Sequence, residues 1–255
     1  ELLDLLRLER IEENIFRGQS QDLGWGTVFG GQVLGQALSA AAQTVPADRH
    51  VHSIHGYFLR QGDARRPIVY EVDPIRDGTS FTTRRVVAVQ GGKPIFTMAA
   101  SFQITESGFD HATEFPLDVP GPEGLPSELD LMRQFADIIP EKLKKRATSE
   151  RPIEIRPVQH SNLLAPVPMP PKRQLWHRSA SRLPDDPAVH CYLLAYASDF
   201  NFLTTAMQPH GVSWLSPGMQ VASLDHAMWF HRPFRLDDWL LYDVDSPSAS
   251  GARGL

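Results

Sequence analysis

The sequence is poor in cysteine, in long apolar runs and in excess charge of either sign. Its single cysteine, Cys191, rules out a disulfide framework within the chain and fits a reducing compartment, so we expect a cytoplasmic protein. No stretch of about 18 apolar residues occurs, and we expect no membrane partner. A net charge of −5 over 255 residues gives no electrostatic basis for binding nucleic acid.

Motifs that would define a cofactor or metal site are also missing. Neither a phosphate-binding glycine loop nor a dinucleotide fingerprint is present, so we expect no cofactor. His50, His52 and His55 are close in sequence, but an extended strand places His52 and His55 on opposite faces. No second cluster of histidine or cysteine accompanies them, and the sequence therefore predicts no metal site.

Two segments that begin like nucleophile motifs are incomplete. Residues 211–215 (GVSWL) start as a nucleophile elbow does, but leucine stands where the second glycine allows close approach of the backbone. Cys191 follows His190, yet adjacent residues on a helix point about 100° apart, and a lone buried cysteine is more often part of a core. These observations argue against serine and cysteine hydrolases.

The chain does contain an internal repeat. At an offset of 172 positions, residues 57–60 (YFLR) match residues 229–232 (WFHR), and residues 68–73 (IVYEVD) match residues 240–245 (LLYDVD). Size, aromaticity and charge agree in both segments, and no gap is needed between them. A repeat of this length exceeds a solenoid unit and indicates a domain-sized module duplicated in tandem.

The first copy has the pattern of one buried helix followed by long strands. Over residues 31–45 the apolar residues follow helical spacing and the other side chains are polar but uncharged, which predicts a buried helix. β-rich segments follow at residues 51–60, 67–75 and 81–103, the last interrupted by a turn signal at residues 90–93 (QGGK). This order predicts an antiparallel sheet wrapped around a helix, in the α+β class.

A linker and a second copy come next. Glycine and proline recur over residues 105–126, and a helix capped by Ser127 is expected to reach residue 146. Strand-like segments at residues 153–159 and 173–179 precede a helical segment at residues 187–203, after which the repeated strands begin.

The repeat divides the chain into a first module at residues 1–110, a linker with a helix at residues 111–150 and a second module at residues 151–255. The copies end differently, because the first module continues for thirty residues after Asp73 and the second for ten residues after Asp245. We therefore expect the last strands of the second module to lie beyond the sequence.

Asp199 is the most informative candidate for catalysis. It falls on the otherwise apolar and aromatic stripe of the predicted 187–203 helix, which should face the core. A buried carboxylate is costly unless it has a partner, so Asp199 either bonds a local backbone amide near the helix end or has a catalytic role. Ser223 is the second candidate. We place it on a strand face with Asp225 and Trp229, where its hydroxyl can orient water or satisfy a neighbouring carbonyl.

Four segments of the chain resemble the type II acyl-CoA thioesterases, a group that includes bacterial thioesterase II and its peroxisomal relatives. They are residues 28–37 (VFGGQVLGQA), 52–60 (HSIHGYFLR), 196–199 (YASD) and 224–233 (LDHAMWFHRP). The resemblance spans nearly the whole chain and implies a double hot-dog fold, in which two tandem modules each wrap an antiparallel sheet around a long helix. It also implies hydrolysis of fatty acyl-CoA to a free fatty acid and CoA.

The same resemblance implies the site residues. The family holds its attacking water with an Asp, a Ser or Thr, and a Gln, and the motifs place the first two on Asp199 and Ser223. The Gln belongs to the last strand of the second module, beyond Leu255, and its first-module counterpart Gln103 receives no catalytic role. We expect direct attack by water, with Asp199 as general base and Ser223 holding the water. Acyl-CoA is the expected partner, and a homo-oligomer, dimer or tetramer, is the expected assembly.

Two other interpretations stay open. A hot-dog protein that binds acyl-CoA without cleaving it would show ligand binding without product release. A hydratase or dehydratase would produce enoyl absorbance instead of a free thiol; it uses an Asp/His pair, and His190 lies nine residues from Asp199, off its helical face. In each case the start of the first long helix, at residues 30–32, offers backbone N–H donors to a ligand.

Overall fold

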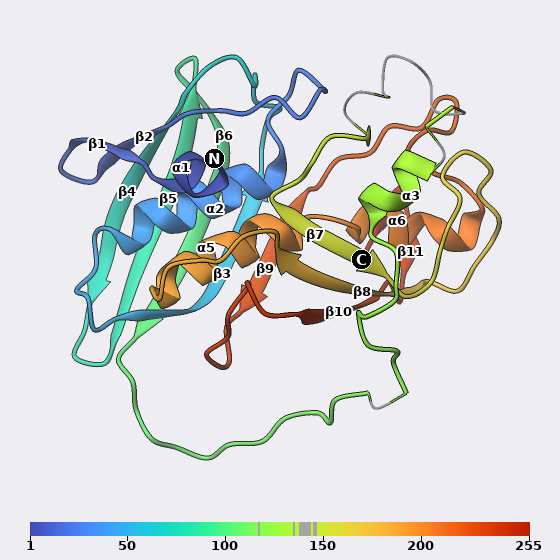
Figure 1. The fold of residues 1–255 in the computed structure, drawn as a ribbon. Helices are drawn as coiled ribbons and strands as arrows, with labels where there is room; N and C mark the ends of the chain where they lie inside the picture. Colours follow the sequence, from blue (N-terminus) through green and yellow to red (C-terminus); the bar gives the residue numbers. More distant parts are fainter. Residues whose placement is uncertain (117, 135, 138–143, 145–146) are drawn as a thin grey trace. The chain divides into compact units, whose positions relative to one another are not determined.

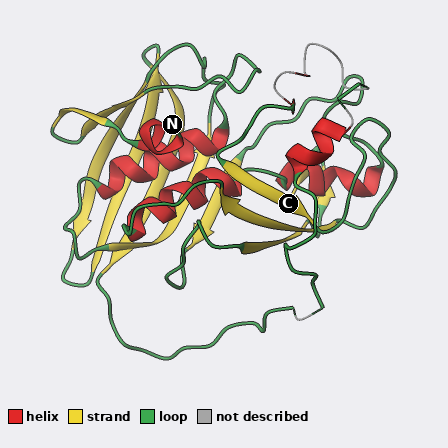
Figure 2. Ribbon diagram, in the orientation of Figure 1, coloured by secondary structure: helices red, strands yellow, loops and turns green. Residues whose placement is uncertain are grey.

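The computed structural model describes residues 1–116, 118–134, 136–137, 144 and 147–255. Contacts between residues divide the chain into two compact units. Unit 1 consists of Glu1–Ala112, Leu183–Asp199 and Ser223–Arg235, and unit 2 of Thr113–Arg182, Phe200–Ala222 and Leu236–Leu255. Helices and antiparallel strands occur in both units, as the predicted α+β class requires (Figure 2). The module boundaries at residues 110 and 151 were drawn from the sequence repeat, whereas the two units are defined by contacts between residues. The module boundaries therefore stay a prediction.

A seven-stranded antiparallel sheet forms the framework of unit 1. Its strands pair in the order β1 (Glu9–Glu12), β2 (Ile15–Gly18), β4 (Ile68–Asp77), β5 (Phe81–Gln90), β6 (Lys93–Gln103), β3 (His50–Phe58) and β9 (Asp225–Trp229). Helices α2 (Gly30–Ala42) and α5 (Pro187–Ser198) lie side by side over one face of the sheet, and α1 (Leu2–Leu6) packs on both (Figure 1). The buried helix and the strands predicted for the first module are confirmed.

Helix α2 has no charged residue, and its polar side chains are buried as well as its apolar ones. Gln32, Gln36 and Ser39 are each less than 5% exposed. The Gln36 amide donates to the Leu5 carbonyl at 2.6 Å, and its own carbonyl oxygen accepts from the Tyr70 hydroxyl at 2.6 Å. A buried polar group is costly unless it is hydrogen-bonded, so these neutral side chains fix α2 between the N-terminal segment and the sheet.

Two glycines allow α2 to approach α5 closely. A Cβ atom at Gly31 would lie 2.2 Å from the carbonyl oxygen of Tyr196, and one at Gly35 would lie 2.9 Å from that of Tyr192. Contacts this short with backbone atoms cannot be relieved by moving a flexible side chain. The glycines therefore bring the beginning of α2 against the end of α5.

The pairing of β3 with β9 confirms the internal repeat in the structure. His55 pairs with Ala227, which is its own copy at the offset of 172. The flanking residues pair with each other's copies: Ser53 with Trp229, and Tyr57 with Asp225. This is the register of two equivalent strands related by a local two-fold axis, as at the interface of a symmetric dimer.

Unit 2 contains a three-stranded antiparallel sheet in the order β10 (Leu240–Asp245), β8 (Lys172–Ser179) and β7 (Ile153–Pro157). It also contains α3 (Glu128–Gln134), α6 (Phe202–Met207), the 3₁₀ turn η1 (Gln208–His210) and the hairpin of β11 (Ala249–Ser250) with β12 (Arg253–Gly254). In that hairpin Ala249 pairs with Gly254, as Asp77 pairs with Thr82 in unit 1. The two pairs are related by the offset of 172, so the repeat continues to the hairpin.

The helix predicted from Ser127 begins as expected. The Ser127 hydroxyl oxygen accepts from the Asp130 N–H at 3.0 Å, and the Asp130 carboxylate accepts in return from the Ser127 N–H at 3.1 Å. This reciprocal arrangement is a capping box. The later part of the prediction, at residues 135, 138–143 and 145–146, lies outside the described residues.

The predicted 187–203 helix is wrong in its length. Helix α5 ends at Ser198, and Asp199 is its C-cap. Asn201 then adopts a left-handed φ of 72°, which Asn tolerates better than most residues, and α6 begins at Phe202. The break places Asp199 at a helix end rather than in mid-helix.

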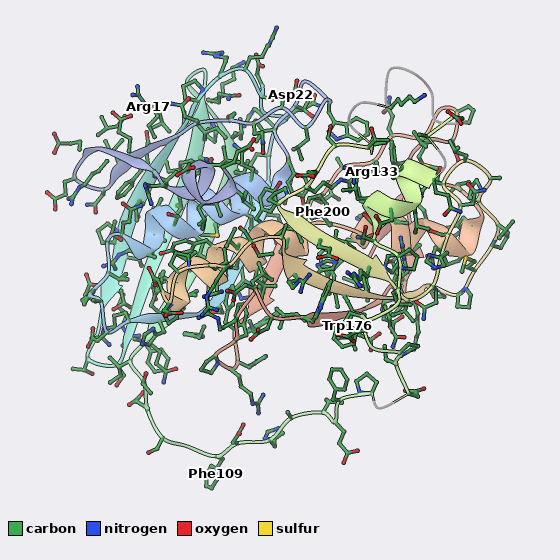
Figure 3. The ribbon with its side chains drawn as sticks, in the orientation of Figure 1. Arg17, Asp22, Phe109, Arg133, Trp176 and Phe200 are labelled. Atoms are coloured by element: carbon green, nitrogen blue, oxygen red, sulfur yellow. The ribbon has the colours of Figure 1, made fainter. Side chains whose placement is uncertain are left out.

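The predicted linker is irregular and exposed where it leaves unit 1. Figure 3 shows Phe109 projecting from this segment into solvent, and its side chain is fully exposed. Among the helices of the described ranges, none has the length and apolar character needed to cross a bilayer.

Candidate active site

Asp199 and Ser223 lie together in unit 1, as the sequence predicts. The Ser223 hydroxyl donates to Asp199 Oδ1 at 3.1 Å, and the Gly31 backbone N–H donates to Asp199 Oδ2 at 2.9 Å. The Asp199 side chain is 6% exposed. Each carboxylate oxygen therefore has its own donor in a largely buried position.

The backbone donor to Asp199 comes from the start of α2 and not from a local amide. Phe29, the N-cap residue of α2, makes no side-chain cap, and Asp199 supplies the missing acceptor from 168 positions away. Helix α5 is capped locally instead, because Asp186 Oδ1 accepts from the Ala188 N–H at 3.0 Å. The alternative in which Asp199 bonds a local backbone amide is therefore wrong. No local sequence pattern shows which distant helix start a carboxylate caps.

Glycine is required where the carboxylate meets the helix start. A Cβ atom at Gly30 would lie 2.6 Å from Asp199 Oδ2 and 3.1 Å from the Phe58 ring. The positive end of the α2 dipole and the Gly31 N–H both favour the ionised carboxylate there. Of the backbone N–H groups at residues 30–32 that were predicted to bind a ligand, the one of Gly31 donates to Asp199 instead.

Burial changes the acidity of Asp199. Desolvation raises its pKa from 3.8 to about 6, although the hydrogen bonds from Ser223 and Gly31 act in the opposite direction. A carboxyl group with this pKa is ionised at neutral pH and is a stronger base than an exposed aspartate. It is suited to accept a proton during a reaction at neutral pH.

Ser223 lies in a loop and not on a strand, which corrects the prediction. Strand β9 begins two residues later, at Asp225. The Leu224 carbonyl still accepts from the Phe58 N–H at 2.9 Å, so the loop is fixed to the end of β3. Since Ser223 is outside the ladder, its side chain turns toward Asp199 instead of following the face of Asp225 and Trp229.

His226 is a site residue that the sequence patterns did not single out. Its Nε2 atom lies 3.0 Å from the Ser198 hydroxyl, and its Nδ1 atom lies 3.9 Å from Asp199 Oδ1. The histidine of the 224–233 segment could have been found only by knowing that β9 begins beside the end of α5. Burial lowers its pKa to about 4, so His226 is neutral near pH 7 and its contact with Asp199 is not an ion pair.

In space His226 lies between Ser198 and Asp199, as the histidine does in a Ser-His-Asp triad, but the three side chains lack the geometry of a triad. The imidazole and the carboxylate are 3.9 Å apart, which is longer than a hydrogen bond. The Ser198 hydroxyl donates to the Ala195 carbonyl at 2.9 Å and its side chain is buried. A serine engaged in this way is not presented to a substrate, in agreement with the sequence argument against a serine hydrolase.

The remaining sequence candidates lie apart from this cluster. Burial raises the pKa of the Cys191 thiol to about 12, which removes it as a nucleophile at neutral pH. His52 bonds the Ser101 hydroxyl, while the His55 ring packs edge-on against Trp229. In the part of the chain that the structure describes, no group of three or more His, Cys, Asp or Glu side chains could hold a metal ion.

The glutamine of the implied catalytic set has no new support. Gln103 lies at the end of β6, where its amide donates to Glu106 at 2.8 Å, and it does not contact Asp199. The glutamine of the implied set stays a prediction.

Comparison with known families identifies the chain through both halves. The profile described as acyl-CoA thioesterase N-terminal domain matches residues 20–103, and the profile described as acyl-CoA thioesterase matches residues 142–255. Acyl-CoA thioesterase 2 of Haemophilus influenzae is 43% identical over 254 residues, covering 100% of this chain and 88% of that protein. Human acyl-coenzyme A thioesterase 8 is 44% identical over 259 residues, covering 98% and 80%.

Solved structures agree with these sequence relatives. An acyl-CoA thioesterase II from Mycobacterium marinum has a TM-score of 0.77 at 43% identity, covering 100% of this chain and 89% of that one. A protein from Mycobacterium avium subsp. paratuberculosis has a TM-score of 0.79 at 31% identity, covering 98% and 87%.

The fold and the cluster at the start of α2 define a double hot-dog protein of the α+β class. Within that class, acyl-CoA thioesterase profiles match both halves of the chain, and an acyl-CoA thioesterase matches its full length. The chain belongs to the acyl-CoA thioesterase family.

Proposed function

We propose that this chain hydrolyses acyl-CoA thioesters by direct attack of water, with Asp199 as general base and Ser223 holding the water. The observation that carries the proposal is the Asp199 carboxylate, which is buried, has a donor on each oxygen and has a pKa raised to about 6. The names of its relatives supply the substrate class, since both curated relatives are thioesterases of acyl-CoA.

The geometry supports the following sequence of bonds. The Ser223 hydroxyl donates a hydrogen bond to Asp199 Oδ1 and keeps its proton, so the lone pairs of its oxygen can accept a hydrogen bond from a water molecule. Asp199 takes a proton from this water while the water oxygen attacks the thioester carbonyl carbon. The tetrahedral intermediate then collapses, the carbon–sulfur bond breaks, and the proton held by Asp199 passes to the departing CoA thiolate, which restores the carboxylate. The products are a fatty acid and free CoA.

The assembly and the compartment belong to the same proposal. Tyr57 and Trp229 are 62% and 57% exposed on the neighbouring strands β3 and β9, and each is the copy of the other in the repeat. Exposed aromatic side chains of this size favour association, which supports a homo-oligomer of two or four chains. The single cysteine supports a location in the cytoplasm, where thiols are kept reduced. Light scattering of the purified protein at several concentrations tests the assembly.

Thiol release from an acyl-CoA tests the reaction with the Asp199→Asn variant. A lost general base should lower kcat by roughly 10²- to 10⁴-fold, with unchanged circular dichroism. Wild-type rates in the variant would refute the assignment of Asp199. Binding of acyl-CoA without thiol release in the wild type would instead favour a binding protein, and enoyl absorbance would favour a hydratase.

A further inference from the structure

We propose that Arg60, Arg66 and Lys93 form a basic rim that binds the phosphate groups of CoA. The inference rests on the proposed function, because it assigns the nucleotide end of the substrate that Asp199 is proposed to cleave. The rim is defined by these three exposed side chains of unit 1.

The basic rim lies at the same end of the sheet as the Asp199 cluster. The Phe58 ring, at the end of β3, is 3.1 Å from the Cβ position of Gly30 beside Asp199. Arg60 follows Phe58 by two residues, and its guanidinium donates to the Pro94 carbonyl at 2.7 Å. Lys93 directly precedes Pro94 at the start of β6. A substrate whose thioester reaches Asp199 can therefore pass its other end over these cations.

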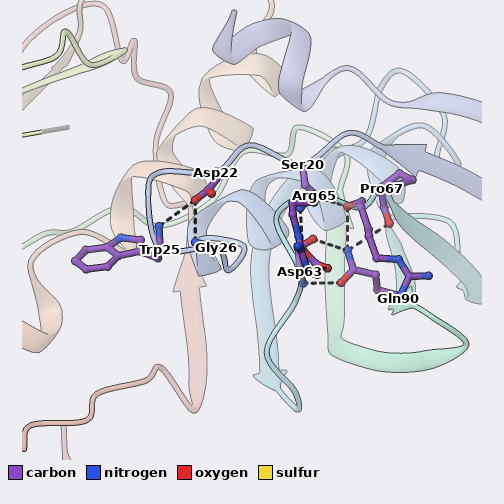
Figure 4. A network of polar contacts seen from close by, with 9 residues as sticks. Ser20, Asp22, Trp25, Gly26, Asp63, Arg65, Pro67 and Gln90 are labelled. Atoms are coloured by element: carbon purple, nitrogen blue, oxygen red, sulfur yellow. Dashed lines mark hydrogen bonds and ion pairs between the residues drawn. The ribbon is translucent and has the colours of Figure 1, made fainter. Parts of the chain in front are cut away.

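Arg66 stands on a loop that is held rigidly. Its carbonyl oxygen accepts from the Ser20 hydroxyl at 2.7 Å and from the Gln90 amide at 2.9 Å. Figure 4 shows this network, in which Gln90 also bonds the backbone of Asp63 and Pro67. The Arg66 guanidinium then lies over the hairpin turn, 3.1 Å from the Cβ position of Gly91. A fixed backbone reduces the entropy lost when a ligand binds.

Charge distinguishes the rim from its surroundings. The neighbouring Arg65 is neutralised, because both oxygens of Asp63 accept from its guanidinium at 2.9 Å. Among the residues that the structure describes, no acidic side chain forms an ion pair with any rim member. Asp63 also acts electrostatically on Arg66, but its carboxylate is bound to Arg65, so the three rim cations remain able to attract a polyanion. CoA offers a diphosphate and a 3′-phosphate, which match such a rim.

The test uses the Arg66→Ala/Lys93→Ala double variant of the whole chain. Its matched control is Arg10→Ala/Arg76→Ala, which removes two exposed cations from β1 and from the opposite end of β4. We expect KM for an acyl-CoA to rise roughly tenfold in the rim variant, with kcat unchanged and the control near wild type. KM for the corresponding acyl N-acetylcysteamine thioester, which lacks phosphate, should not change in either variant.

Calorimetric titration with CoA itself separates this proposal from the proposed function. The rim variant should bind CoA roughly tenfold more weakly than wild type, whether or not the chain turns over thioesters. Titration with 3′-dephospho-CoA assigns the contact: a smaller loss in the variant identifies the 3′-phosphate, and an equal loss identifies the diphosphate. Equal CoA affinity in wild type and rim variant, or an equal loss in the control, would overturn the rim.

Discussion

Replacing Asp199 with asparagine should make the folded protein more stable at neutral pH while it lowers kcat roughly 10²- to 10⁴-fold. Burial raises the pKa of Asp199 from 3.8 to about 6, so its proton is bound more tightly in the folded chain than in the unfolded one. The resulting contribution to the free energy of unfolding is full below pH 3.8 and is lost as the pH rises through about 6. At about 1.4 kcal/mol for each pKa unit, the loss is about 3 kcal/mol.

Asparagine can keep both contacts of the carboxylate. Its side-chain oxygen can accept from the Gly31 N–H, and its amide can donate to Ser223 once that hydroxyl reverses its direction. The shape of the side chain is unchanged, so no cavity is created. The variant therefore removes the buried charge without removing its hydrogen bonds.

Urea unfolding between pH 4 and pH 7 measures the effect for wild type and for Asp199→Asn. The variant should gain stability relative to wild type by about 3 kcal/mol across that range, with most of the change between pH 4 and pH 6. The exposed Asp243→Asn change on β10 is the control.

A difference that stays constant with pH would refute the raised pKa of Asp199. A variant that is less stable than wild type at pH 7 would show that the ionised carboxylate gains more from the Gly31 and Ser223 donors than burial costs. Either result would also remove the argument that Asp199 is a stronger base than an exposed aspartate.

Three further changes test the surroundings of the carboxylate. Gly31→Ala places a Cβ 2.2 Å from the Tyr196 carbonyl and should cost about 1 to 3 kcal/mol in thermal or urea unfolding, whereas Gly108→Ala, with open space around it, should cost far less. Ser223→Ala should lower kcat roughly 10- to 100-fold in the thiol-release assay while the fold persists, and a wild-type kcat would exclude a role in holding water. Ser198→Ala should leave kcat in the thiol-release assay near the wild-type value. A lost kcat with intact folding would reopen a covalent serine mechanism.

The repeat and the helix–sheet order were predictable from sequence because they depend on patterns that extend over many residues. The buried helix α2, the QGGK turn and the strands on either side of it all follow from periodicity and turn chemistry. Gly91 and Gly92 take φ values of 60° and 74°, as a two-residue hairpin turn requires. Here local preference and the final fold agree.

The site was predictable only in part, because its contacts join segments that no local pattern connects. Asp199 was identified as an acid on an apolar stripe, yet its partner Gly31 is 168 positions away. Ser223 was found by its motif, while its place in a loop depends on where β9 begins. His226 was missed since it reaches Ser198 only after β9 is paired beside β3. Non-local pairing decides such features, and sequence patterns do not carry it.

The two places that the two-fold register of β3 and β9 relates carry different side chains. At the offset of 172, the copy of Ser223 is Val51 and the copy of His226 is Ile54, which is fully buried in the core. The helices diverge in the same way, since α2 takes its cap from distant Asp199 while α5 is capped by its own Asp186. A symmetric pair of modules would repeat the polar cluster and bury a second costly carboxylate. Apolar side chains and a local cap at the second place avoid that cost.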